Sequence, residues 1–201
     1  MKYGLIALTA LVLSACSSMP SWVPGSGWTT LIDGDKGMEN FTRTGGANWR
    51  AEGGAIVADK SPDNSYLVTK ESYGNAVIRV EFWAAPLTNS GVFVRAQDRN
   101  KIGANNAYEV NIYDARPGQE YATGGIVDHA KVSQSHKVAD KWNTYEITMK
   151  GPTITVMLNG QKTSEMTDAK RLNGPFALQF GNHGKEPGDV IKWRKVQVKP
   201  L

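Results

Sequence analysis

The residues best suited to chemistry are polar side chains that alternate with apolar ones in short segments. Glu109 and Asn111 are two residues apart in one such segment, and Gln179 stands between two apolar residues in another. Carboxylates and amides form directional hydrogen bonds to sugar hydroxyls, and a carboxylate can also act as a general base. The spacing therefore predicts an outward polar face whose groups are chemically suited to sugar hydroxyls.

Further candidates occupy the outward position of a neighbouring apolar pattern or follow it directly: Glu81, Trp83, Asn89, Arg95 and His183. With the first three residues they offer a pair of carboxylates, a guanidinium, amides, an aromatic ring and an imidazole. The flat face of an aromatic ring packs against the apolar face of a pyranose. We expect six of the candidates to converge on one concave cleft, with Glu109 and Arg95 on neighbouring strands: Glu81, Arg95, Glu109, Asn111, Gln179 and His183.

Each position also has a purely structural interpretation. Polar residues of an alternating strand face solvent by default. Glu81 and Arg95 can form an ion pair across two strands. Trp83 can cover a sheet edge, and His183 can belong to a turn.

The motifs of several enzyme classes are absent from the sequence. It contains no Gly-rich phosphate loop, no His-Glu-x-x-His and no paired Cys-x-x-Cys. The three histidines, His129, His136 and His183, are too widely spaced to predict a metal site by themselves. The Asp128-His129 pair is typical of a loop. The sequence therefore predicts no metal and no cofactor.

Short alternating segments separated by turn residues fill the chain after residue 27. Residues 76–83, 143–149 and 154–158 each alternate apolar and polar side chains, which is typical of half-buried strands. Lys150–Thr153 link the last two segments as a hairpin, and Asn159-Gly160 is a strong tight-turn signal. We find no amphipathic helix pattern and no internal repeat. The fold class predicted is all-β, an antiparallel β-sandwich of about ten strands forming one domain over residues 28–201.

The last segment mixes apolar residues of both parities. Ile191 and Trp193 fall on one parity, and Val196 and Val198 fall on the other. A bulge near Arg194-Lys195 would bring all four to one face. The densest basic patch lies in the same segment, in an alternating pattern typical of a solvated strand face: Lys192, Arg194, Lys195 and Lys199. We expect no nucleic-acid partner, because the formal net charge is only +4 and the other charges are scattered.

The N-terminus has the order of a signal peptide. Lys2 precedes an apolar run from Leu5 to Leu13 that is too short to span a membrane. The run ends in Leu13-Ser14-Ala15-Cys16, and Cys16 is the only cysteine of the chain. This arrangement resembles a bacterial lipoprotein signal peptide with its lipobox. The resemblance implies cleavage after residue 15 and a lipid on the Cys16 thiol.

The expected organisation is a signal peptide over residues 1–15, a tether over residues 16–27 and the sandwich over residues 28–201. The tether is rich in Ser, Pro and Gly. The membrane is thus an expected partner through the lipid, in a bacterial cell envelope. Ser17 follows the cysteine, which in a Gram-negative host implies the outer membrane, facing the periplasm. The alternative is an ordinary secretory signal with an incidental cysteine.

A series of short pieces in order along the domain resembles the bacterial 3-keto-disaccharide hydrolase domain family, a member of the concanavalin A-like lectin and glucanase superfamily with a jelly-roll sandwich. The pieces are Gly27–Gly34, Trp49–Ile56, Glu81-Phe82 with Asn89–Arg95, Tyr108–Asp114, Trp142-Asn143, Leu158–Gly160, Leu178-Gln179 with His183-Gly184, and Trp193–Val196. The chain departs from the family pattern at three places: Asn111 stands where Gln is usual, Asn182 is inserted before His183, and Val127-Asp128 replaces an aromatic residue.

The resemblance implies cleavage of glycosides already oxidised to a ketone at C3. Such a ketone acidifies the C2 hydrogen, so a base can remove it and expel the C1 substituent before water adds. By this resemblance Glu109 is the first candidate for the base and Glu81 the second. Arg95 and His183 would stabilise the enolate oxygen.

The remaining candidates would bind the sugar. Asn89, Asn111 and Gln179 would orient hydroxyls, and Trp83 would stack on the ring. An ordinary glycosidase with paired carboxylic groups is the less favoured form of the enzyme. Two other functions stay open from the sequence: a non-catalytic carbohydrate-binding envelope lipoprotein, and an envelope scaffold that binds a protein through an exposed sheet face.

Overall fold

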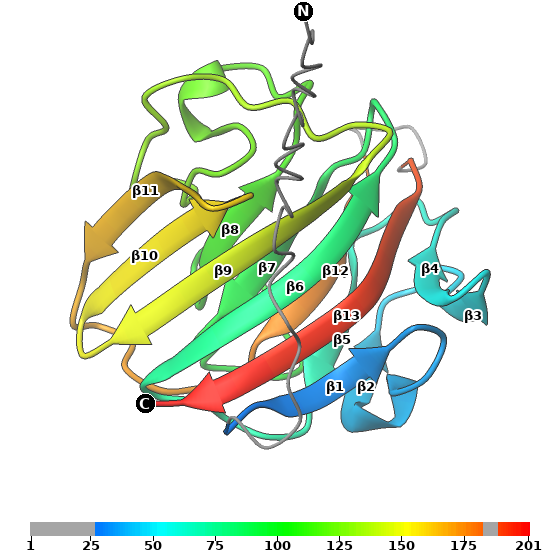
Figure 1. Cartoon of the computed structure of the whole chain (residues 1–201), viewed down its shortest axis with the longest axis horizontal. Coiled ribbons are helices and arrows are strands. Elements are labelled where there is room, and N and C mark those ends of the chain that lie inside the picture. The colour runs from blue at the N-terminus through cyan, green and yellow to red at the C-terminus, as the bar shows by residue number, and fades with distance from the viewer. Residues whose placement is uncertain (1–26, 183–188) are drawn as a thin grey trace, which may run out of the picture.

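Two antiparallel sheets pack face to face in the computed structural model, which describes residues 27–182 and 189–201 (Figure 1). The expected signal peptide, the tether and Cys16 therefore lie outside the described residues, except for Gly27 at the end of the tether. The prediction of an all-β antiparallel sandwich is confirmed.

The larger sheet has eight strands in the order β11-β10-β9-β6-β13-β4-β3, with β1 also paired to β13. Their bounds are β1 (Thr29–Asp33), β3 (Arg50–Glu52), β4 (Ala55–Ala58), β6 (Ala76–Ala84), β9 (Trp142–Lys150), β10 (Thr153–Leu158), β11 (Gln161–Thr167) and β13 (Ile191–Pro200).

The smaller sheet has five strands in the order β2-β5-β12-β7-β8. Their bounds are β2 (Phe41–Thr44), β5 (Ser65–Thr69), β7 (Ser90–Val94), β8 (Tyr108–Ile112) and β12 (Ala177–Phe180). Two single 3₁₀ turns, η1 (Met38–Asn40) and η2 (Gln119–Tyr121), complete the elements. No helix within residues 27–182 and 189–201 is long and apolar enough to cross a membrane.

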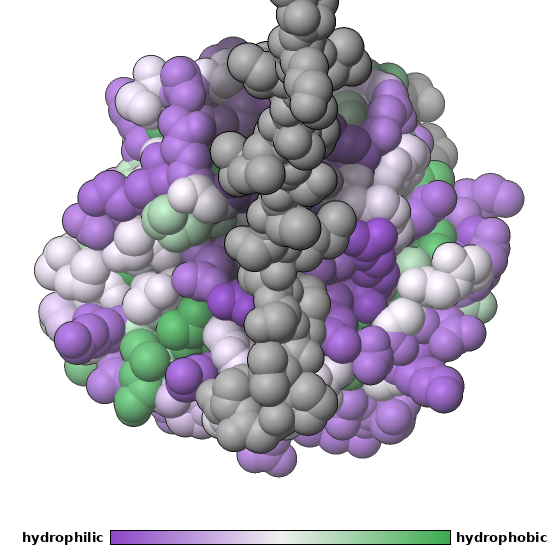
Figure 2. All heavy atoms as spheres, in the orientation of Figure 1, coloured by the Kyte–Doolittle hydropathy of each residue, from purple (hydrophilic) through white to green (hydrophobic). Residues whose placement is uncertain are grey.

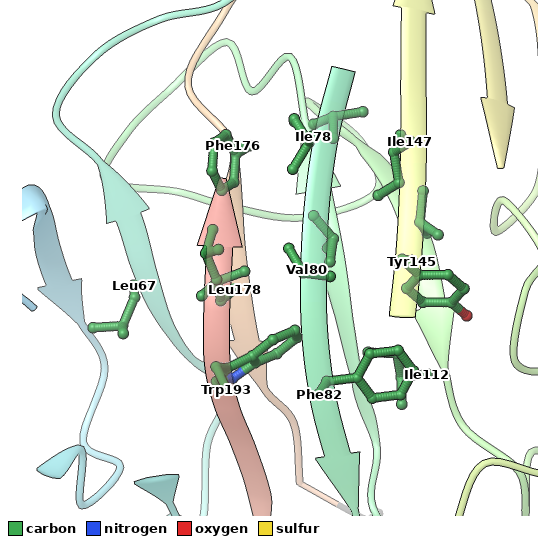
Figure 3. Close-up of a cluster of buried hydrophobic side chains, with 14 of the residues drawn as sticks. Leu67, Ile78, Val80, Phe82, Ile112, Tyr145, Ile147, Phe176, Leu178 and Trp193 are labelled. Atoms are coloured by element: carbon green, nitrogen blue, oxygen red, sulfur yellow. The ribbon is translucent and has the colours of Figure 1, made fainter. Parts of the chain in front are cut away.

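The core forms between the sheets because each strand turns every second side chain inward. Strand β6 alternates buried and partly exposed residues along its whole length, with Ile78, Val80 and Phe82 inside. These side chains meet Leu178 of the smaller sheet across the interface (Figure 3). Phe82 also contacts the rings of two neighbouring strands, with centroids 5.0 Å from Tyr145 and 6.1 Å from the indole of β13.

A buried hydrogen bond also crosses from one sheet to the other. The Tyr145 hydroxyl on β9 donates to the main-chain oxygen of Asn111 on β8, at 2.6 Å. A buried hydroxyl without a partner would lower the free energy of unfolding by about 1–3 kcal/mol. This bond therefore fixes the position of β8 relative to the larger sheet.

The turn chemistry predicted from the sequence is confirmed. Asn159 and Gly160 both have positive φ, 50° and 83°, between paired Leu158 and Gln161. The pairing of β13 with β6 shifts between Trp193 and Lys195, so β13 is bulged where its parity changes. The bulge buries all four apolar residues of the last segment.

The outer face of the larger sheet is turned toward the viewer in Figure 2. The visible part of this face is mainly hydrophilic, with smaller apolar areas between the polar side chains. This distribution agrees with an antiparallel sheet that packs on a core through one face only.

The alternation of β9 can be tested with two adjacent substitutions. Ile147 is fully buried, and Thr148 lies on the outer face of the same strand. We expect Ile147→Ala to lower the free energy of unfolding by about 2–5 kcal/mol, because it leaves a cavity between the sheets. Thr148→Ala should change it by less than about 0.5 kcal/mol. Denaturant unfolding of both variants measures the difference, and equal losses would contradict this assignment of faces.

Candidate functional site

A polar cluster lies on the outer face of the smaller sheet. The strand register pairs Tyr66 with Gln179 and Gly91 with Asn111. The pairing of β12 with β7, continued by the Asn89–Gly181 bridge, sets Gln179 beside Gly91. A row across four neighbouring strands thus consists of Tyr66, Gln179, Gly91 and Asn111. We call it the polar row.

Glu109 borders the polar row from the next position of β8. It pairs with Phe93, and its side chain leans back over Gly91. A Cβ atom on Gly91 would lie 3.3 Å from Glu109 Cγ, 3.4 Å from its Oε1 and 2.9 Å from the Val110 oxygen. A residue without a side chain is thus needed for the carboxylate to lie against the strand.

Burial controls the charge of this carboxylate. Loss of solvent raises the pKa of Glu109 from 4.5 to about 7, the nearby charge of Asp128 adds to the rise, and Arg116 opposes it. Its side chain keeps some solvent access. A base with a pKa near neutrality is well matched to proton transfer at neutral pH.

Tyr66 supplies a hydroxyl on the same sheet face, and its pKa responds to the charge of Glu109. Its ring packs edge-on against Phe93, with centroids 5.4 Å apart. Burial raises the pKa of Tyr66, hydrogen bonds from Gln179 and Asn64 oppose the rise, and the charge of Glu109 adds to it. Tyr66 therefore stays a neutral hydrogen-bond donor at ordinary pH.

Both amides of the polar row have an oxygen without a partner. Asn111 Oδ1 and Gln179 Oε1 are buried and accept no hydrogen bond from the described residues. The other end of Asn111 is fixed, because its Nδ2 donates to the Tyr121 oxygen at 2.6 Å. Buried polar atoms are normally satisfied, so two open acceptors in one row mark a place where a ligand could donate hydrogen bonds.

The segment after β8 forms hydrogen bonds with the edge of β8 that faces away from β7. Val127 N donates to the Glu109 oxygen and Asn111 N donates to the Gly125 oxygen, both at 3.0 Å. The segment is itself tied down by Asp114, whose carboxylate accepts bonds from the Thr123 hydroxyl at 2.6 Å and from two main-chain amides. Hydrogen bonds thus fix this edge of the site, and Ile126 of the same segment also packs into the apolar core.

Asn89 lies on the same face, one position beyond the row. Its Nδ2 donates to the Asn182 oxygen at 2.8 Å, and its main-chain oxygen accepts from Gly181 at 2.9 Å. Asn89, Glu109, Asn111 and Gln179 thus share one sheet face, as expected from their parity.

The expectation that Arg95 points outward beside Phe93 is wrong. Strand β7 ends at Val94, and Arg95 takes a left-handed conformation with φ 55°, which interrupts the alternation. Its guanidinium is fully buried and donates to the main-chain oxygens of Gly74 and Arg171 at 3.3 and 3.2 Å. Burial lowers the pKa of Arg95.

The expectation that Glu81 and Trp83 join Glu109 is also wrong. Both do face outward, but from β6 of the larger sheet, so they lie on the opposite face of the sandwich. Glu81 forms an ion pair with Arg194 at 2.6 Å instead of with Arg95. Their roles as substrate-binding residues of this cluster therefore have no geometric support.

His183 and Cys16 lie outside the described residues. The sequence patterns did not identify Tyr66 as a site residue. A usable signal was its position next to Leu67 in an apolar segment, which places the two side chains on opposite faces of a strand. Asp128 and Arg116 were missed because their effect on Glu109 depends on loop geometry. No group of three or more His, Cys, Asp or Glu in the described parts of the chain could hold a metal ion.

The fold defines the class of protein. The two-sheet antiparallel sandwich is a concanavalin A-like and galectin-like fold. More specifically, residues 27–199 match the 3-keto-alpha-glucoside-1,2-lyase-like domain, and the chain belongs to this family. No curated protein matches the sequence significantly.

Solved structures of low identity share the fold. A candidate glycosyl hydrolase from Parabacteroides distasonis is 25% identical, with a TM-score of 0.68 over 87% of this chain and 99% of that one. A second candidate glycosyl hydrolase from the same organism is 17% identical, with a TM-score of 0.73 over 87% and 94%. The carbohydrate-binding module CBM66 of Bacillus subtilis is 14% identical, with a TM-score of 0.58 over 86% and 95%.

The raised pKa of Glu109 has a consequence for stability. The folded chain holds this proton to a higher pH than the unfolded chain does, so the free energy of unfolding falls as pH rises from the usual glutamate range to about 7, and stays level above it. We expect Glu109→Gln to lack this fall and to exceed the wild type above pH 7 by on the order of 1–2 kcal/mol. Denaturant unfolding at about pH 5 and about pH 8 measures it, and an unchanged pH dependence would refute the assignment.

Proposed function

We propose that the protein cleaves 3-keto-glycosides, with Glu109 as the base. The observation that carries the proposal is the position of this carboxylate: it has a pKa of about 7 and lies over a glycine, beside two amides with open acceptors. Membership of the lyase-like family and the resemblance to a candidate glycosyl hydrolase support the reaction class.

The proposed reaction is an elimination followed by hydration. The Glu109 carboxylate takes the proton from C2, and the electron pair of that C–H bond forms an enolate with the C3 ketone. The enolate then restores the ketone, forms a C1–C2 double bond and expels the C1 oxygen, which takes up a proton as the alcohol leaves. Water adds to C1 and a proton returns to C2, which gives the free 3-keto sugar.

Neutral donors and acceptors would bind the sugar. The Tyr66 hydroxyl, kept protonated, would donate to the developing enolate oxygen or to the leaving oxygen. The open oxygens of Asn111 and Gln179 would accept hydrogen bonds from sugar hydroxyls. Arg95 receives no step in this reaction, because its guanidinium is already bound to main-chain oxygens.

The decisive experiment compares two glutamates on opposite faces. With a 3-keto-glucoside as substrate, Glu109→Gln should lower kcat by at least about 100-fold, which is the usual contribution of a general base. Glu81→Gln, on the larger sheet, should keep wild-type turnover. The wild-type rate should fall as pH drops below about 7, because the base becomes protonated.

Other results would reject parts of the proposal. Equal turnover by Glu109→Gln would remove this residue as the base. Calorimetric binding of a glycan by the wild type, with no turnover of 3-keto or plain disaccharides, would favour a carbohydrate-binding protein instead, a function that the fold also supports. Cleavage of plain disaccharides alone would indicate ordinary glycosidase chemistry.

We also propose that the protein is anchored to a bacterial membrane through a lipid on Cys16. The support is the order of charged, apolar and small residues before the only cysteine. A single acyl chain gives only reversible membrane binding, so stable anchoring needs more than one chain.

Metabolic labelling tests this anchor. Cells that express the chain with a clickable palmitate analogue should label the wild type, and Cys16→Ser should lose the label because it has no thiol. Ser17→Ala is the matched control and should keep it. Labelling of Cys16→Ser at the wild-type level would contradict the proposal.

A further inference from the structure

A second aromatic and charged surface lies on the outer face of the larger sheet. One row of paired positions crosses five of its strands and carries Trp142, Trp83, Lys192, Val57 and Arg50 in that order. It faces away from the polar row, because the two sheets turn their outer faces in opposite directions. We call it the tryptophan row.

Four residues of the row line a hollow of about 400 Å³: Trp142, Lys192, Val57 and Arg50. Glu52 lines the same hollow, and Trp83 does not. Trp142 is at one side of the hollow and Arg50 at the other, with Lys192 and Val57 between them. Val57 lines the hollow and is only 3% exposed, so it forms part of the floor. The volume is within the range of small-ligand sites in proteins.

Both indole rings are held by cations. Lys192 Nζ lies 4.5 Å from the centre of the Trp83 ring, and Arg194 Cζ lies 4.3 Å from that of Trp142. Trp142 nevertheless remains 36% exposed. The Trp142 indole is therefore held in place while part of it stays open to a ligand.

The charges of this surface are unevenly paired. Arg194 binds Glu81 at 2.6 Å, and Arg50 binds Asp59 at 2.9 Å. Arg50 also pairs with a second carboxylate, that of Glu52 at the end of β3. In the described parts of the chain, Lys192 is the cation of this row with no carboxylate in ion-pair distance. Its ammonium group is thus available to an anionic group in the hollow.

We propose that the tryptophan row binds a saccharide that carries a carboxylate, such as a uronic acid. The pyranose lies against the exposed part of Trp142, and its carboxylate reaches Lys192. This site is separate from the polar row, so it serves to hold an acidic glycan rather than to cleave one.

Calorimetry with trigalacturonate and its methyl ester tests the proposal on the full chain. The ester has the same rings without the negative charges, so it should bind at least about tenfold more weakly. Lys192→Met keeps the apolar stem and should weaken trigalacturonate binding by about tenfold, as should Trp142→Ala. Lys150→Met, an exposed lysine at the far end of β9, should bind as the wild type does.

The proposal would be overturned by no binding of trigalacturonate, by equal binding of the ester, or by wild-type affinity in Lys192→Met. The test is independent of the proposed catalysis. Glu109→Gln should bind trigalacturonate normally, and Lys192→Met should cleave 3-keto-glucosides normally. Loss of acid-glycan binding in Glu109→Gln would mean that the ligand occupies the polar row, which also refutes a second site.

Discussion

The apolar layer between the two sheets decides which strand positions are left for charged side chains. Strand β6 gives each inward position to an apolar or aromatic residue, and β9 does so except at the buried Asn143. The charged residues of both strands therefore have only the outer face left. The buried bond from Tyr145 to β8 adds a fixed height to this arrangement. The polar row and the tryptophan row are therefore both by-products of one packed interior, on its two opposite sides.

Alternation predicted the inside and the outside of the strands, and it could not predict which sheet a strand joins. Glu81 and Glu109 both face outward as expected, yet they lie on opposite surfaces because β6 and β8 belong to different sheets. The predicted outward orientation of Arg95 was wrong for a different reason: Arg95 itself has a positive φ, which ends the alternation just after the strand. Strand partners and local φ values depend on the whole fold, so a single pattern does not contain them.

Gly91 and the two amides show how a sheet face can become chemically specific. The absent side chain at Gly91 leaves space for the Glu109 carboxylate. Burial there disfavours the charged form of Glu109 and raises its pKa. The unused amide oxygens beside it carry a similar cost without a ligand. A purely structural face has no reason to keep three such unfavourable features next to one another.

The order of strands in the two sheets also limits how the chain reaches its fold. Strand β12 lies between β5 and β7, and β13 lies between β6 and β4, although both come from the last part of the sequence. Neither sheet is complete until these C-terminal strands pair with their neighbours. Many contacts therefore join residues that are far apart in the sequence. High contact order makes folding slow. A ribosome-bound fragment without the final strands would expose unpaired edges, and such a chain depends on chaperones for longer than one built from local hairpins.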